Sequence, residues 1–131
     1  MAIKTASRWF SPRVGEEIDL VRWGHFGTPV LLFPTAGGDA QEVERMGLLG
    51  ALWPLIEAGR IKVYSCDSVA GRALAAGWGT VEYRCTLLNG FQEYVAHEVV
   101  PAIRSDCHDG SIEVIAAGAS IGAFNAVAVT C

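Results

Sequence analysis

The stretch Ser111-Ile112-Glu113-Val114-Ile115-Ala116-Ala117-Gly118-Ala119-Ser120-Ile121-Gly122 decides the fold. Its first seven residues form a short, mostly apolar run that is typical of a buried strand. From Ile121 onward the residues are small and apolar, which indicates a helix. Residues 118–122 lie between the two and fit the pattern G-x-S-x-G. The sequence therefore predicts a strand that turns tightly into a helix, with Ser120 at the turn.

Three further apolar runs upstream of this stretch are predicted strands. They cover residues 16–23, 29–33 and 61–66, and each is bounded by Gly, Pro or Asp. The first two are separated by the Gly-containing segment 24–28, so we expect them to pair as an antiparallel hairpin.

Two longer segments show the spacing of helices. Residues 41–58 place apolar side chains on one helix face, and Pro54 is expected to bend or shorten this helix. Residues 80–104 carry an apolar stripe at four-residue steps, whereas the passage rich in Gly and Ala before Gly79 is expected to be a loop. Strands that alternate with helices predict an α/β fold, with helices on both faces of a mainly parallel sheet.

The composition fits such a sheet and argues against several other classes of protein. Of the 131 residues, 51% are hydrophobic and 18% charged, which suits strands covered on both faces. No apolar run approaches the roughly 18–20 residues of a membrane-spanning helix. The net charge of −4 and the lack of a basic run argue against nucleic-acid binding. Residues 1–10 lack the apolar core of a signal peptide, so we expect a cytoplasmic location.

The cysteines give no sign of a metal or disulfide framework. Cys66, Cys85, Cys107 and Cys131 are far apart in the sequence and form no C-x-x-C pair. We therefore expect reduced thiols, and we expect neither a bound metal nor a cofactor.

The turn around Ser120 has the features of a nucleophile elbow, the strand-to-helix turn that exposes a catalytic serine. Gly118 and Gly122 leave room where a Cβ would clash with the neighbouring strand or helix, and the following helix directs free N–H groups toward developing negative charge. An alternative is that Ser120 simply caps a helix of small residues.

A serine nucleophile in acyl transfer also needs donors for the oxyanion. The Ile121 amide is one candidate. The loop Pro34-Thr35-Ala36-Gly37-Gly38-Asp39 follows a predicted strand, and the backbone N–H of Ala36 or Gly37 is the second candidate. The alternative is an ordinary Gly-Gly turn that leads into a helix capped by Asp39.

Four segments together carry a family resemblance: residues 33–39, 63–68, 98–103 and 118–124. With them, roughly residues 10–131 resemble the amino-terminal portion of the esterase D and antigen-85-like branch of the α/β-hydrolases. The resemblance implies a serine carboxylesterase-like fold. It also implies that Ser120 is the nucleophile and that Ile121, with the loop around Ala36 and Gly37, forms the oxyanion hole.

The remaining members of a catalytic triad are not found in the expected order. α/β-Hydrolases place the acid and then the histidine after the serine, but neither residue type occurs after Ser120. His25 and His108 precede predicted strands and belong at the opposite edge of the sheet, and His97 lies along a helix. Asp67 lies at the correct edge, where it could orient a substrate or cap a loop.

These observations favour a domain that is completed by further residues. The strand before Ser120 would be left with an open apolar edge, and such edges invite pairing with another chain. We expect the 131 residues to be the amino-terminal part of one domain, completed by a carboxyl-terminal half, a second chain or another copy. The favoured activity is ester hydrolysis on a small molecule through an acyl-Ser120 intermediate. A non-catalytic binding module and an acyltransferase are the alternatives.

Overall fold

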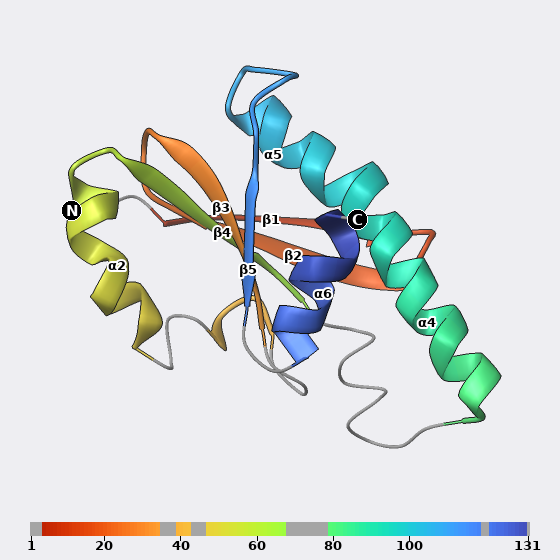
Figure 1. The fold of residues 1–131 in the computed structure, drawn as a ribbon. Helices are drawn as coiled ribbons and strands as arrows, with labels where there is room; N and C mark the ends of the chain where they lie inside the picture. Colours follow the sequence, from red (N-terminus) through yellow and green to blue (C-terminus); the bar gives the residue numbers. More distant parts are fainter. Residues whose placement is uncertain (1–3, 35–38, 43–46, 68–78, 119–120, 131) are drawn as a thin grey trace.

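A five-stranded mixed sheet forms the centre of the protein (Figure 1). The computed structural model describes residues 4–34, 39–42, 47–67, 79–118 and 121–130. The strand order is β1-β2-β4-β3-β5. The strands are β1 (Lys4–Ser11), β2 (Glu16–Trp23), β3 (Thr28–Phe33), β4 (Ile61–Cys66) and β5 (Ile115–Gly118).

The three strands β4, β3 and β5 run parallel, as the α/β prediction required. The predicted hairpin between residues 16–23 and 29–33 is wrong. β2 pairs antiparallel with β1 and with β4, whereas β3 lies between β4 and β5. Both faces of β3 and β4 can then be covered, which suits their apolar runs better than a hairpin position does.

Strand β1 was not predicted from the sequence. Its residues KTASRWFS are largely exposed and lack an apolar alternation. The strand is stabilised instead by an eight-residue antiparallel ladder with β2, from Lys4 opposite Trp23 to Ser11 opposite Glu16.

Helices cover the two faces of the sheet (Figure 1). α2 (Leu48–Glu57) lies within the predicted range 41–58 and includes Pro54 one turn before its end. The second helical segment runs as α4 (Val81–Tyr94), the π-helix η1 (Val95–Val99) and α5 (Val100–Asp106), followed after β5 by α6 (Ile121–Thr130). Along the described part of the chain, no helix combines the length and the apolar character needed to span a membrane.

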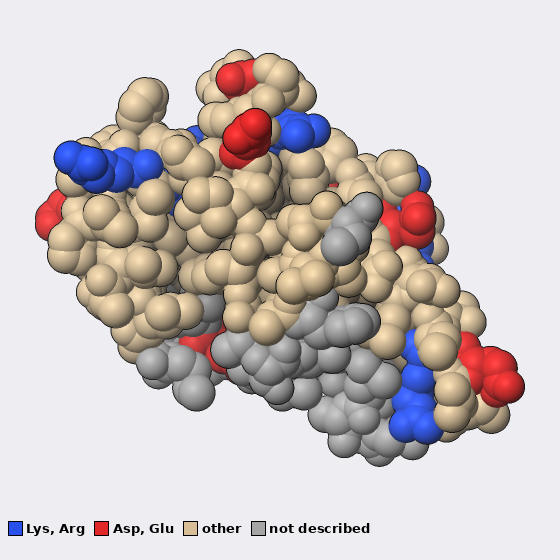
Figure 2. All heavy atoms as spheres, viewed as in Figure 1, with Lys and Arg blue, Asp and Glu red and all other residues tan. Residues whose placement is uncertain are grey.

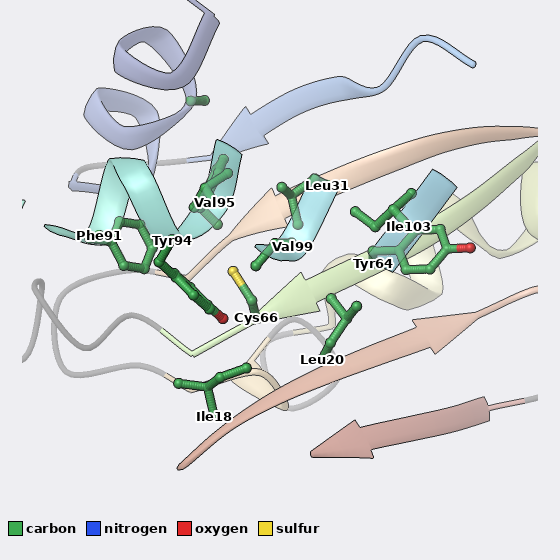
Figure 3. Packing of buried hydrophobic residues seen from close by; sticks show 12 residues of the cluster. Ile18, Leu20, Leu31, Tyr64, Cys66, Phe91, Tyr94, Val95, Val99 and Ile103 are labelled. Carbon is green, nitrogen blue, oxygen red and sulfur yellow. The ribbon is translucent and has the colours of Figure 1, made fainter. Parts of the chain in front are cut away.

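Two apolar clusters lie on opposite faces of the sheet. One contains Leu31, Tyr64, Phe91 and Val99 and is covered by α4, η1, α5 and α6 (Figure 3). The other contains Val63, Leu32 and Ile56 and is covered by α2. The two clusters take alternate residues of β4, as expected for a strand buried on both faces.

The π-helix η1 leads into α5, whose second residue, Pro101, cannot donate a helical hydrogen bond. Within η1, the Glu98 carboxylate accepts hydrogen bonds from Trp9 Nε1 at 2.9 Å, Ser11 Oγ at 2.8 Å and Arg13 Nη1 at 3.1 Å. Burial raises the pKa of Glu98, but the three hydrogen bonds together lower it by more. The pKa therefore lies below its ordinary value. Glu98 thus joins the helical layer to β1.

Strand β5 is shorter than the predicted 111–117. The Asp109 carboxylate accepts hydrogen bonds from both the backbone N–H and the hydroxyl of Ser111, which holds residues 109–112 in a turn. Pairing begins only at Ile115, opposite Val30 of β3. Among the described residues β5 pairs with β3 alone, so it forms one edge of the sheet, where Ile115 is 51% exposed.

Candidate active site

The carboxyl ends of the three parallel strands meet at one edge of the sheet (Figure 1, lower side). Phe33 lies opposite Gly118, and Leu32 lies opposite Ser65. Pro34 therefore leaves β3 beside the turn into α6, and Asp67 directly follows the neighbouring strand β4. This is the edge at which ligands bind in open α/β sheets.

The turn between β5 and α6 is closely packed on both sides. A Cβ built at Gly118 would lie 2.4 Å from the Gly122 carbonyl carbon and 2.5 Å from its oxygen. A Cβ at Gly122 would lie 2.5 Å from the Phe33 carbonyl oxygen and 2.9 Å from that of Pro34. Since all these neighbours are backbone atoms that cannot rotate away, both positions accept only glycine without a backbone shift. The strand and the helix can approach this closely only because both side chains are absent.

The predicted nucleophile and one of the two predicted oxyanion segments lie outside the described residues. These are Ser120, Ala36 and Gly37. Ile121 is the first residue of α6, so its backbone N–H belongs to the first turn, where N–H groups have no partner within the helix. The free N–H groups and the helix dipole favour negative charge at this end of α6.

Asp67 holds together three segments at this edge. Its Oδ1 accepts a hydrogen bond from the Ala40 backbone N–H, and its Oδ2 accepts one from that of Asp19, both at 3.0 Å. The residue is 9% exposed. Of the two roles considered for Asp67, capping a loop is the one that these contacts show. The carboxylate fixes the turn that immediately follows the 35–38 segment.

Asp39 has the role of a cap, as the alternative interpretation of the loop proposed. Its Oδ1 accepts a hydrogen bond from the Gln41 backbone N–H at 2.9 Å, and its carbonyl accepts one from Glu42 at 3.0 Å. The 35–38 segment is therefore bounded by anchored residues on both sides. Pro34 is packed against Gly122, and Ala40 is bonded to Asp67.

Cys66 and Tyr94, which lie in the core next to this edge, do not supply an alternative nucleophile. Cys66 at the end of β4 is fully buried, and burial raises the pKa of its thiol to about 12. Burial also raises the pKa of the Tyr94 hydroxyl, which lies beside Cys66 in Figure 3. Both groups stay protonated at neutral pH, so they act as parts of the core.

The three histidines lie away from the site, as predicted. His25 is exposed in the turn before β3, where its ring packs beside Gly59 at the opposite edge of the sheet. His108 is exposed between α5 and β5, with a φ of 55°. His97 is exposed on η1 and lies 3.0 Å from the Glu93 carboxylate. In the described structure, none of the three lies at the edge where β5 leads into α6.

One buried polar residue near the site was not singled out from the sequence. Asn125 lies on α6, one turn beyond Gly122, and is fully buried. Neither its amide nitrogen nor its amide oxygen has a hydrogen-bond partner among the described residues. A polar residue within the small and apolar run of α6 was the signal that could have identified it.

Comparison with solved structures identifies the type of fold. The chain is similar to a cold-adapted esterase from an Arctic intertidal metagenomic library, with a TM-score of 0.63 and 17% identity over 98% of this chain and 55% of that chain. It is also similar to the ferric enterobactin esterase of Salmonella typhimurium, with a TM-score of 0.59 and 17% identity over 95% of this chain and 32% of that chain. A third similar structure is an IroE-like serine hydrolase from Shewanella oneidensis, with a TM-score of 0.55 and 12% identity, covering 88% and 41%. No family model and no curated protein matches the sequence.

These structures confirm the expected fold. The chain has the α/β-hydrolase type of fold found in esterases and serine hydrolases. It spans between 32% and 55% of the length of the three similar structures.

Proposed function

We propose that this chain carries the nucleophile of a serine-dependent carboxylic-ester hydrolase and is the amino-terminal part of one α/β-hydrolase domain. The observation that carries the proposal is the packing of Gly118 and Gly122. Two glycines that exclude any side chain, on either side of a serine between a parallel strand and a helix, are what a nucleophile elbow requires.

In the proposed mechanism, Ser120 Oγ attacks the carbonyl carbon of a small-molecule ester while a histidine takes the serine proton. The tetrahedral oxyanion accepts hydrogen bonds from the Ile121 N–H and from an N–H of Ala36 or Gly37. The intermediate collapses to an acyl-Ser120 ester, and the alcohol leaves with the proton returned by the histidine. Water then attacks the acyl-enzyme by the same route, releases the acid and restores Ser120.

The histidine and its acid partner are proposed to come from beyond residue 131. The three histidines of this chain are exposed and lie away from the β5–α6 turn. Asp67 accepts two backbone hydrogen bonds and so serves to hold the loop in place. The shared acyl-enzyme also serves acyl transfer to an alcohol in place of water, and this is the second candidate reaction.

A fluorophosphonate probe with mass spectrometry tests the proposal. The preparation should contain the carboxyl-terminal part, because the activating base is placed there. We expect one adduct on Ser120, its loss in Ser120→Ala, and unchanged labelling in Ser111→Ala, which removes an exposed serine elsewhere. Absence of the Ser120 adduct would refute the enzyme proposal and favour a binding module on the same scaffold.

The partner proposed for this chain pairs with the edge of β5. The face of the molecule that carries β5 and α6 is largely uncharged (Figure 2). Ile115 is 51% exposed on this edge strand. An apolar edge strand offers unpaired N–H and C=O groups to a further strand, either from a carboxyl-terminal half or from another copy.

Light scattering with intact-mass analysis tests this association. We expect the purified chain to self-associate or to retain a bound polypeptide. Ile115→Lys should weaken the association, because a charge at an edge opposes strand addition. Val81→Lys on α4 is the matched control, since Val81 is 66% exposed away from the edge. A monomer free of any partner for the unmodified chain would contradict the proposal.

A further inference from the structure

A pocket of about 540 Å³ lies at the edge of the sheet opposite the candidate active site. It is formed where the turns before β3 and β4 meet the loop between α5 and β5, at the top of Figure 1. Its lining includes Thr28, Arg60, Lys62 and Asp109. Figure 2 shows charged side chains on this upper side of the molecule.

Lys62 is the unusual residue in this pocket. The residue is only 7% exposed, and its Nζ lies 5.9 Å from the centre of the Tyr64 ring. No carboxylate of the described residues lies within ion-pair distance of Lys62. Lysine is seldom buried without a charged partner, because the ammonium group loses its hydration.

The acidic groups near Lys62 are already engaged by other donors. Asp106 accepts two hydrogen bonds from Arg22 Nη1, at 2.9 and 2.8 Å, and one from the Tyr64 hydroxyl. Asp109 Oδ1 accepts two hydrogen bonds from Ser111, both at 3.0 Å. Asp106 also interacts electrostatically with Lys62, but at more than ion-pair distance, so Lys62 shares with Arg22 a carboxylate that it does not contact directly.

Arg60 adds a second positive charge to the same pocket. Its side chain is exposed, and no ion pair or side-chain hydrogen bond is found for it in the described structure. Its backbone is held firmly, because its carbonyl accepts a hydrogen bond from the Thr28 N–H at 3.0 Å. Gly27 packs against the same peptide, where a Cβ would lie 2.3 Å from the Arg60 carbonyl carbon. The backbone that positions Arg60 in the pocket is therefore fixed without a ligand.

We propose that this pocket binds a small oxyanion, a phosphate or a carboxylate, between Lys62 and Arg60. The anion supplies the direct ion-pair partner that Lys62 lacks, and the planar guanidinium group of Arg60 can donate two hydrogen bonds to its oxygens. The Thr28 hydroxyl in the lining is a further donor. The site does not depend on Ser120 and lies at the edge of the sheet opposite the carboxyl ends of the parallel strands.

Titration of the 131-residue chain, followed by backbone amide NMR at constant ionic strength, tests the proposal. Inorganic phosphate is one probe and acetate is the other, so that the two kinds of oxyanion are distinguished. We expect saturable binding of at least one of them, with shifts centred on residues 27–28 and 59–62. Lys62→Met should weaken binding about tenfold or more.

Two further variants make the result decisive. Arg60→Gln should also weaken binding, and because Arg60 is exposed this variant tests the site even if Lys62→Met fails to fold. Arg84→Gln on α4 removes the same charge far from the pocket and should leave binding unchanged. The proposal is overturned if neither anion binds saturably, if Arg60→Gln binds as the unmodified chain does, or if Arg84→Gln weakens binding equally.

Discussion

Gly122→Ala tests the close packing on which the proposed nucleophile turn rests. The new Cβ would lie 2.5 Å from the Phe33 carbonyl oxygen, about 0.9 Å closer than the 3.4 Å at which ordinary contact begins. The obstacle is backbone, so α6 must move away from β3. Forcing a methyl group into a packed core costs about 1–3 kcal/mol. Alanine returns up to about 1 kcal/mol as the better helix former. We therefore expect the free energy of unfolding to fall by about 1–2 kcal/mol.

Urea unfolding followed by tryptophan fluorescence measures this change. With a slope of about 1–3 kcal/mol per molar urea, the midpoint should fall by roughly 1 M. Gly50→Ala in α2 is the matched control, because a Cβ at Gly50 meets nothing within 4 Å. That variant should gain about 0.5–1 kcal/mol of stability. If Gly122→Ala is as stable as the unmodified chain, the turn is not as close as described and the argument for the elbow fails.

Three further predictions concern residues that join separate elements. Asp67→Ala should cost about 2–4 kcal/mol in urea unfolding, because two backbone N–H groups lose their acceptor, and Asp67→Asn, which keeps one oxygen, should cost less. The pKa of Glu98 in the folded state lies below its ordinary value of 4.5. The ionised carboxylate therefore stabilises the fold above pH 4.5, and this stabilisation is lost as the pH falls. In unfolding measured from about pH 5 to pH 3, Glu98→Gln should make the stability less dependent on pH. Thr80→Ala should lower the stability of α4 by about 0.5–2 kcal/mol in thermal unfolding monitored by circular dichroism, since Thr80 Oγ1 accepts a hydrogen bond from the Tyr83 N–H; an unchanged melting temperature would contradict this.

Local sequence patterns were sufficient to predict the elements on which the site is built. The apolar runs at residues 16–23, 29–33 and 61–66 and the helical stripe after residue 80 all form in the structure. Each is a pattern of near neighbours in the chain, and the parallel arrangement followed from their alternation.

Strand pairing could not be predicted in the same way. The short Gly-containing connection between β2 and β3 favours a hairpin, but β4 lies between these two strands. A strand's neighbours are decided by which apolar faces can be buried together, which depends on residues distant in sequence. β1 was missed for the same reason, because its stabilisation comes from its ladder with β2 and from contacts such as that of Trp9 with Glu98.

The sequence by itself determined the order of β2 to β5 and of the helices along the chain, and the placement of Ser120 between a strand and a helix. These properties are local or are fixed by chain order. Only the tertiary structure decided that Gly122 meets the carbonyls of β3 and that Asp67 anchors the turn at Ala40. It also decided that Lys62 is largely buried beside the Tyr64 ring. Such properties depend on which atoms meet across the sheet, and that is set by packing between segments far apart in the chain.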